Sequence, residues 1–191
     1  PNACNIALAS ARAGNVIGGG DWAQDRIVPD CIRALKRKEP IPIRNKFSTR
    51  PWQHVLEPLS GYLLIAAELW RGLNKKKLLQ AGISHESLCS AFNFGPHLEA
   101  NRTVETLVQE VLKHWSGEWL DCSDSNALHE ASRLNLSIDK AFHMLGWKPR
   151  WKFEEAVKNT IDWYREAENP SANLQEITRK QIIAYQNCSS V

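Results

Sequence analysis

The sequence predicts an α/β fold in which buried strands alternate with amphipathic helices. Two short apolar runs, residues 6–11 and 91–96, have the length and composition of buried parallel strands. Each run leads into a loop and then into residues with helical periodicity. The second half of the chain is mixed and mainly helical, which fits a small lobe packed beside a doubly wound sheet.

The first half is expected to contain two helices separated by an extended segment. Pro29 is tolerated in the first turn of a helix that we expect to run to about Lys38, and Pro40 ends it. Ile41-Pro42-Ile43 predicts an edge strand, because proline cannot donate a hydrogen bond to a ladder. Pro58 lies near the start of the next helix. The apolar face predicted for that helix contains Leu59, Tyr62, Leu63, Ala66, Leu69 and Trp70.

The second half predicts three more helices. Thr103 is expected to cap one of them, and Ser137 is expected to cap a short one that ends at Gly146. The last is expected to span residues 153–166. Short strands are predicted near residues 119–120 and 133–136.

Composition limits the classes of protein that the chain can represent. With 191 residues, 43% of them hydrophobic, it fits one domain, or one domain with a fragment of another. The net charge of +3 is too small to require a nucleic-acid or membrane partner, although it suits an anionic ligand. The longest apolar run, residues 63–67, is too short to span a bilayer. We expect no partner nucleic acid, no membrane and no signal peptide.

The cysteines indicate a reducing environment. Their number is odd, their spacing is wide and no Cys-x-x-Cys pair occurs, so neither a metal site nor a disulfide framework is expected. They are Cys4, Cys31, Cys89, Cys122 and Cys188. Reduced thiols in a cytoplasmic protein are the simplest interpretation.

The most informative segment is Arg50-Pro51-Trp52-Gln53-His54-Val55-Leu56-Glu57-Pro58. It follows Ile41-Pro42-Ile43-Arg44-Asn45 and the glycine-rich turn Asn15-Val16-Ile17-Gly18-Gly19-Gly20-Asp21-Trp22. Further along, His129-Glu130-Ala131 and Leu145-Gly146-Trp147-Lys148-Pro149 complete the pattern. Taken together, these motifs resemble the C-terminal half of the extended short-chain dehydrogenases/reductases that act on nucleotide sugars, in particular the CDP-glucose 4,6-dehydratases.

The resemblance implies a Rossmann-like fold of which residues 1–191 form the C-terminal half. Residues 4–18 and 90–96 are then the last strands of the parallel sheet. Residues 19–56 and 97–185 mainly form the small mixed α/β substrate-binding lobe.

The same resemblance implies a lyase that removes water from a nucleotide-bound glucose with the help of NAD. In that family the Gly-x-x-Gly-x-x-Gly turn and the catalytic Tyr-x-x-x-Lys pair belong to the first half, and neither motif occurs in these 191 residues. We therefore expect no catalytic residue in this chain, no activity of the chain alone, and NAD bound mainly by a preceding half. Homo-oligomerisation is also expected through that half.

Two residues are expected to contact the diphosphate of the substrate. Asn15 follows the first strand, and ligands of open α/β sheets bind outside the carboxyl ends of strands. Arg50 offers a planar fork that matches two phosphate oxygens. The resemblance assigns both residues to the diphosphate. The alternatives are that Asn15 is only a turn asparagine beside glycines and that Arg50 is only a surface arginine in a loop. His54, a lone histidine in an apolar turn, is expected to be structural.

The remaining predicted site residues would surround the nucleoside. Arg26 and Ile27 occupy the place where related epimerases contact the nucleotide, at a helix N-terminus that favours phosphate. Pro42 and Arg44 are expected to flank the base, and a guanidinium that stacks on cytosine favours a CDP-sugar. Glu130 is expected to accept hydrogen bonds from the ribose, or else to be a solvated loop acid.

Two other functional classes stay open. One is a different NAD-dependent nucleotide-sugar epimerase or dehydratase of the same superfamily, which base preference would distinguish. The other is a non-catalytic nucleotide-sugar-binding domain, which the coding sequence upstream would distinguish.

Overall fold

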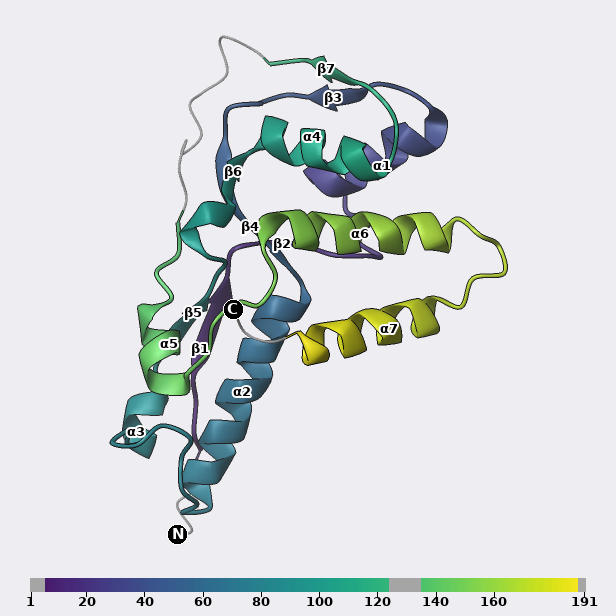
Figure 1. Ribbon diagram of the computed structural model, residues 1–191. Coiled ribbons are helices and arrows are strands. Elements are labelled where there is room, and N and C mark those ends of the chain that lie inside the picture. The colour runs from purple at the N-terminus through teal and green to yellow at the C-terminus, as the bar shows by residue number, and fades with distance from the viewer. Residues whose placement is uncertain (1–5, 124–134, 189–191) are drawn as a thin grey trace.

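The computed structural model describes residues 6–123 and 135–188 and has the predicted α/β fold (Figure 1). The helices are α1 (Ile27–Arg37), α2 (Leu56–Leu73), α3 (His85–Leu88), α4 (Val104–His114), α5 (Asp139–Leu145), α6 (Phe153–Ala167) and α7 (Leu174–Asn187), with a 3-10 turn at Leu98–Ala100. The strands are β1 (Ser10–Ala13), β2 (Asn15–Ile17), β3 (Ile41–Ile43), β4 (Thr49–His54), β5 (Ala91–Phe94), β6 (Asn101–Thr103) and β7 (Trp119–Asp121).

The strands pair in three small sheets that follow one another through the molecule. β1 runs parallel to β5, β2 runs parallel to β4, and β3 runs parallel to β7, while β6 pairs antiparallel to β4. A single residue, Gly14, separates β1 from β2. A Cβ at Gly14 would lie 2.8 Å from the Pro51 carbonyl oxygen, so only glycine lets the chain pass this close to β4. This passage brings Asn15 alongside Trp52.

Two hydrophobic clusters hold these sheets. The larger cluster joins α1, α4 and α6 to β3, with Ile32, Val108 and Ile161 among its fully buried members. The smaller cluster lies between α2, α5 and β5 and includes Phe94 and Trp147. The larger cluster supports the segments that form the pocket described below.

Several local predictions are confirmed. α1 spans Pro29 and ends at Arg37, β3 coincides with Ile41-Pro42-Ile43, and the Thr103 side chain caps α4 by accepting a hydrogen bond from the Thr106 N–H at 3.1 Å. α5 ends at Leu145, and Gly146 caps it with a φ of 66°. The predicted Ser137 cap is wrong by one position, because Ile138 precedes α5 and its side chain makes no capping bond.

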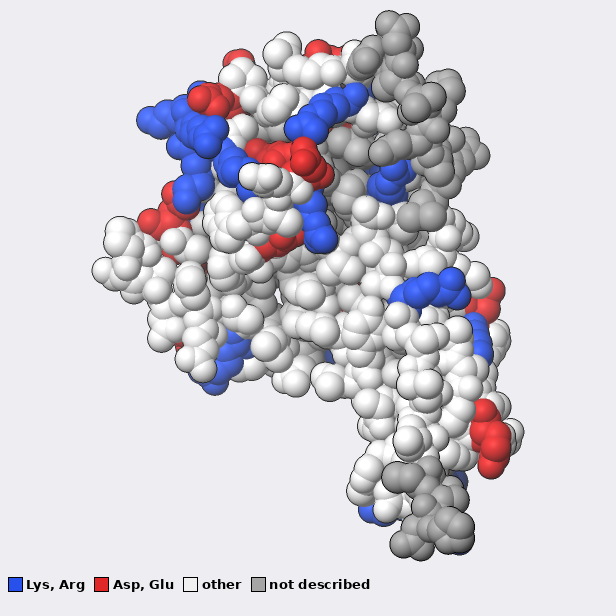
Figure 2. Space-filling model, turned by 180° about the vertical axis from the view of Figure 1, so that it is seen from behind, with Lys and Arg blue, Asp and Glu red and all other residues white. Residues whose placement is uncertain are grey.

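The first apolar run contributes only its last residues, Ser10 and Ala11, to the predicted parallel strand, which pairs with β5. β1 begins at Ser10, and Ile6 and Leu8 before it are 78% and 75% exposed. The predicted apolar face of α2 is also largely uncovered, since Leu63 and Trp70 are exposed while Glu57 and Glu68 are buried. Figure 2 shows one face of the arm that contains α2, β1 and β5; this face is mostly uncharged, with charged residues along its edge. Apolar periodicity therefore located α2 correctly but assigned its buried face wrongly.

Glu57 is buried because it joins three elements. Its carboxylate accepts hydrogen bonds from the Arg150 N–H (3.0 and 3.1 Å), the Trp151 N–H (2.7 Å) and the Tyr185 hydroxyl (2.7 Å). These bonds connect α2 to the segment before α6 and to α7, a helix that the sequence did not predict. Within residues 6–123 and 135–188, no helix is long and apolar enough to cross a bilayer.

Candidate functional site

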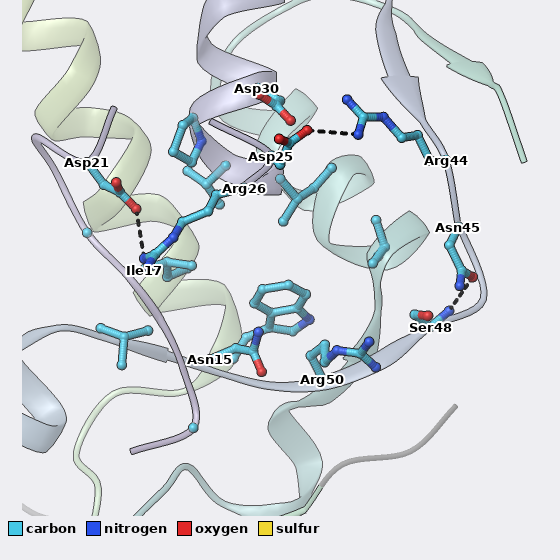
Figure 3. Close-up of a pocket in the computed structure, with 18 of the residues that line it drawn as sticks. Asn15, Ile17, Asp21, Asp25, Arg26, Asp30, Arg44, Asn45, Ser48 and Arg50 are labelled. Carbon is cyan, nitrogen blue, oxygen red and sulfur yellow. Dashed lines mark hydrogen bonds and ion pairs between the residues drawn. The ribbon is translucent and has the colours of Figure 1, made fainter. Parts of the chain in front are cut away.

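A cavity of about 670 Å³ opens between the loop at residues 18–26, the first turn of α1, the end of β3 and the strand β4 (Figure 3). Its volume is in the range of small-molecule and cofactor sites. Three arginines, Arg26, Arg44 and Arg50, line it together with Asp21 and Asp25. The described lining residues therefore carry charges of both signs, with the cations set on three different segments.

Asn15 and Arg50 form one wall of the cavity. Asn15 opens β2 directly after the carboxyl end of β1 and pairs with Trp52 of β4. Arg50 lies two residues before Trp52 on the same strand, so its side chain leaves the same face of the strand. Arg50 donates a hydrogen bond to its neighbour's carbonyl oxygen, Thr49 O, at 3.0 Å. In the β4–β6 ladder it lies opposite Arg102, which places two arginines on one face of a strand pair.

Arg26 and Ile27 come from the start of α1. Arg26 is the N-cap residue, and the first helical residues, Ile27 and Val28, line the cavity with N–H groups that have no partner within the helix. Pro29 has no N–H, and the Asp30 N–H is bonded to the Arg26 carbonyl oxygen. The Arg26 guanidinium donates to the Asp21 carboxylate at 3.3 Å. A helix N-terminus carries partial positive charge, and the neighbouring arginine adds to the attraction for an anion.

Pro42 and Arg44 form the opposite wall, at the end of β3. Arg44 donates to the Asp25 carboxylate at 2.8 Å, which joins β3 to the loop before α1 across the cavity (Figure 3). This hydrogen bond raises the pKa of Arg44, whose guanidinium therefore stays charged. Asp25 has a φ of 60°, a conformation uncommon outside glycine and associated with functional sites.

Comparisons with known proteins show what the chain is similar to in sequence and in fold. No protein-family model matches the chain. The chain is 42% identical over 162 residues to the CDP-glucose 4,6-dehydratase of Salmonella typhimurium, and the match covers 84% of this chain and 42% of that protein. The resemblance predicted from the sequence is confirmed.

Solved structures show the same fold. DesIV, a dTDP-glucose 4,6-dehydratase from Streptomyces venezuelae, has a TM-score of 0.64 at 20% identity, over 86% of this chain and 45% of its own length. The UDP-glucose 4-epimerase of Thermotoga maritima has a TM-score of 0.60 at 20% identity, over 84% and 47%. The chain thus has the fold of the C-terminal part of an extended short-chain dehydrogenase/reductase, and it spans less than half the length of these proteins. NAD is bound in the DesIV structure, so the predicted use of NAD by the family is confirmed.

The structure brings most of the predicted site residues together. The same cavity is lined by Asn15, Arg26, Ile27, Pro42, Arg44 and Arg50. Glu130 lies outside the described residues, and its expected contact with the ribose stays a prediction. The roles of all seven are taken up as proposals below.

Sequence reasoning missed five polar residues of the cavity, namely Asp21, Asp25, Asp30, Asn45 and Ser48. Asp21 and Asp25 hold two of its arginines, and Asn45 accepts a hydrogen bond from the Ser48 N–H at 3.2 Å in the turn before β4. Asn45 is a typical turn residue, so its spacing from Ser48 was a usable signal. Asp21 and Asp25 gave no such signal, because their partners lie on neighbouring segments that meet only in the fold.

His54 does not line the cavity. It is 1% exposed, its Nδ1 accepts a hydrogen bond from the Leu56 N–H at 3.3 Å, and its ring packs edge-on against Trp151 at 4.8 Å. Burial lowers the pKa of His54 to about 4, so the imidazole is neutral at pH 7. These contacts favour the structural interpretation, with His54 fixing the start of α2.

Proposed function

We propose that the chain is the nucleotide-sugar-binding part of a 4,6-dehydratase that acts on CDP-glucose. The observation that carries the proposal is the cavity in which Asn15, Arg26, Arg44, Arg50 and the first turn of α1 converge. The 42% sequence identity between this chain and a CDP-glucose 4,6-dehydratase supports this assignment.

The diphosphate is proposed to bind between Arg50, Asn15 and the start of α1. A guanidinium can donate two parallel hydrogen bonds to phosphate oxygens, and an amide can donate further ones. Arg26 lies over the first turn of α1, where N–H groups and the helix dipole favour an anion. In the structure Asp21 pairs with Arg26 and Asp25 pairs with Arg44, so these two carboxylates partly neutralise the two cations of the site.

The base is proposed to lie against Pro42 and Arg44. The Arg44 guanidinium can stack on a pyrimidine and donate to the carbonyl oxygen of cytosine. Glu130 is proposed to accept hydrogen bonds from the ribose hydroxyls. A related enzyme that differs in its base, such as a dTDP- or UDP-sugar enzyme, is the second candidate, because DesIV and the Thermotoga epimerase share this fold.

The chemistry is proposed to reside in the part of the relatives' length that this chain does not span. The complete protein would convert CDP-glucose to CDP-4-keto-6-deoxyglucose and water, with bound NAD supplying the hydride acceptor. Neither the Gly-x-x-Gly-x-x-Gly turn nor the Tyr-x-x-x-Lys pair occurs in the 191 residues, so we assign no residue of this chain to NAD or to catalysis. What the chain supplies is binding energy from the nucleotide, which positions the reacting sugar. A homo-oligomer and a cytoplasmic location stay predictions.

Competition between nucleotides tests the proposal. The dissociation constants of CDP, UDP and dTDP are measured by calorimetry on the complete protein that contains this chain. We expect CDP to bind at least tenfold more tightly than UDP or dTDP, a difference of about 1.4 kcal/mol. Equal affinities would transfer the support to the second candidate, and no binding of any of the three would contradict a nucleotide-sugar site.

A further inference from the structure

The loop at residues 18–26, which forms one wall of the cavity, is held from behind by α6 and α1. A Cβ at Gly19 would lie 2.1 Å from the ring of Trp163, so the loop packs directly on α6. The next residue of α6, Tyr164, donates from its hydroxyl to the Asp21 carbonyl oxygen at 2.6 Å. Arg33 of α1 donates to the Trp22 and Ala23 carbonyl oxygens, each at 3.1 Å.

Asp21 links this packed side of the loop to the cavity through hydrogen bonds. Its carbonyl oxygen is fixed by Tyr164, while its carboxylate accepts from the Ala23 N–H at 3.0 Å and from the Arg26 guanidinium at 3.3 Å. Figure 3 shows Arg26 directed back across the cavity toward Asp21. A continuous path of hydrogen bonds thus runs from α6 through Asp21 to a cation of the cavity.

We propose that Tyr164 and Asp21 are positioning residues that orient Arg26 toward the diphosphate of the ligand. The inference rests on the proposed function, because it makes Arg26 the second cation, beside Arg50, that binds the diphosphate. Tyr164 is 1% exposed and does not line the cavity, so it acts on the ligand only through Asp21.

Two properties of Tyr164 suit this role. Burial raises the pKa of Tyr164 to about 12, so its hydroxyl remains a donor at every pH at which the protein is expected to work. Its ring meets Trp22 edge-on at 5.2 Å, which fixes the loop on the other side of Asp21. The hydroxyl and the ring therefore restrain the same short segment.

The test compares two tyrosine hydroxyls of similar burial in the complete protein. Tyr164→Phe removes the bond to Asp21, and the control Tyr185→Phe removes the bond to Glu57, which lies outside the cavity lining. We expect Tyr164→Phe to weaken CDP binding about fivefold, the equivalent of about 1 kcal/mol for one hydrogen bond. Tyr185→Phe should lower the thermal midpoint without changing the dissociation constant.

Three further measurements distinguish positioning from general destabilisation. In an Arg26→Gln background, Tyr164→Phe should cause no further loss of CDP affinity, because the guanidinium that Tyr164 helps to orient is then absent. With CDP-glucose as substrate, Tyr164→Phe should raise KM more than it lowers kcat. Asp21→Ala acts on the same path from the cavity side, because it removes both hydrogen bonds of a side chain that is 32% exposed. It should reproduce the fivefold loss even if Tyr164→Phe does not fold.

The outcomes distinguish failure of the positioning role from failure of the proposed function. Wild-type protein that binds CDP, with unchanged affinity in both Tyr164→Phe and Asp21→Ala, would refute the positioning role and leave the proposed function standing. Additive losses in the double variant with Arg26→Gln would also refute it. Wild-type protein that binds no nucleoside diphosphate would contradict the proposed function, and this inference with it.

Discussion

Replacing His54 tests whether that residue is structural, and the magnitude follows from its burial. His54 is 1% exposed, and burial lowers its pKa from 6.5 to about 4. Nδ1 is used as an acceptor by the Leu56 N–H, so protonation would both charge a buried ring and remove a hydrogen bond at the start of α2. The folded state therefore binds this proton less readily than the unfolded state does.

The direction of the pH dependence follows from that difference. Well above pH 6.5 the imidazole is neutral in both the folded and the unfolded state, and its titration does not change the free energy of unfolding. As the pH falls from 6.5 toward 4 the unfolded state takes up the proton, and the free energy of unfolding decreases by up to about 3.4 kcal/mol, at about 1.36 kcal/mol per pH unit. Between pH 7 and pH 5 the expected decrease from this residue is about 2 kcal/mol.

The assay is denaturant unfolding of the complete protein at pH 7 and pH 5, followed by tryptophan fluorescence. The variant is His54→Asn, which keeps an acceptor for the Leu56 N–H but cannot titrate. Because other groups also titrate, the informative quantity is the difference between the two pH responses. We expect wild type to lose about 2 kcal/mol more than His54→Asn between pH 7 and pH 5. Identical losses would show that His54 is not a buried neutral residue.

Two further predictions concern the cavity. Arg50→Lys should keep the charge but remove the planar fork, and so weaken CDP binding by about 1–3 kcal/mol in calorimetry; an unchanged dissociation constant would place Arg50 outside the diphosphate site. Arg44→Phe should reduce the preference for CDP over UDP by at least about tenfold in competition experiments. An identical ratio before and after that substitution would make Arg44 only a surface charge beside the cavity.

The sequence predicted the fold where the signal is local. Pro29 and Pro40 bounded α1, and the resemblance carried by the segment around Arg50 led to six residues that line one cavity. Asp21 could not be found in this way, because its partners Tyr164 and Arg26 lie on other elements or beyond a turn.

The burial predicted for the side chains of α2 was wrong, because it depends on tertiary contacts. Leu63 and Trp70 are spaced as a core face but are exposed, whereas Glu57 is buried by its bonds to Arg150, Trp151 and Tyr185. Periodicity shows that a helix has an apolar face, but not which face the rest of the chain covers. The chain spans less than half the length of its relatives.

Turnover of CDP-glucose tests the central claim most directly. The complete protein is incubated with NAD and with CDP-glucose, UDP-glucose or dTDP-glucose in turn, and the 4-keto product is followed by its alkali-induced absorbance. We expect the product from CDP-glucose at a rate at least about tenfold above that from the other two sugars, and no product from residues 1–191 alone. A rate with UDP- or dTDP-glucose that equals or exceeds the rate with CDP-glucose would contradict the assignment. Product formed by the isolated chain would contradict its role as a binding part without the chemistry.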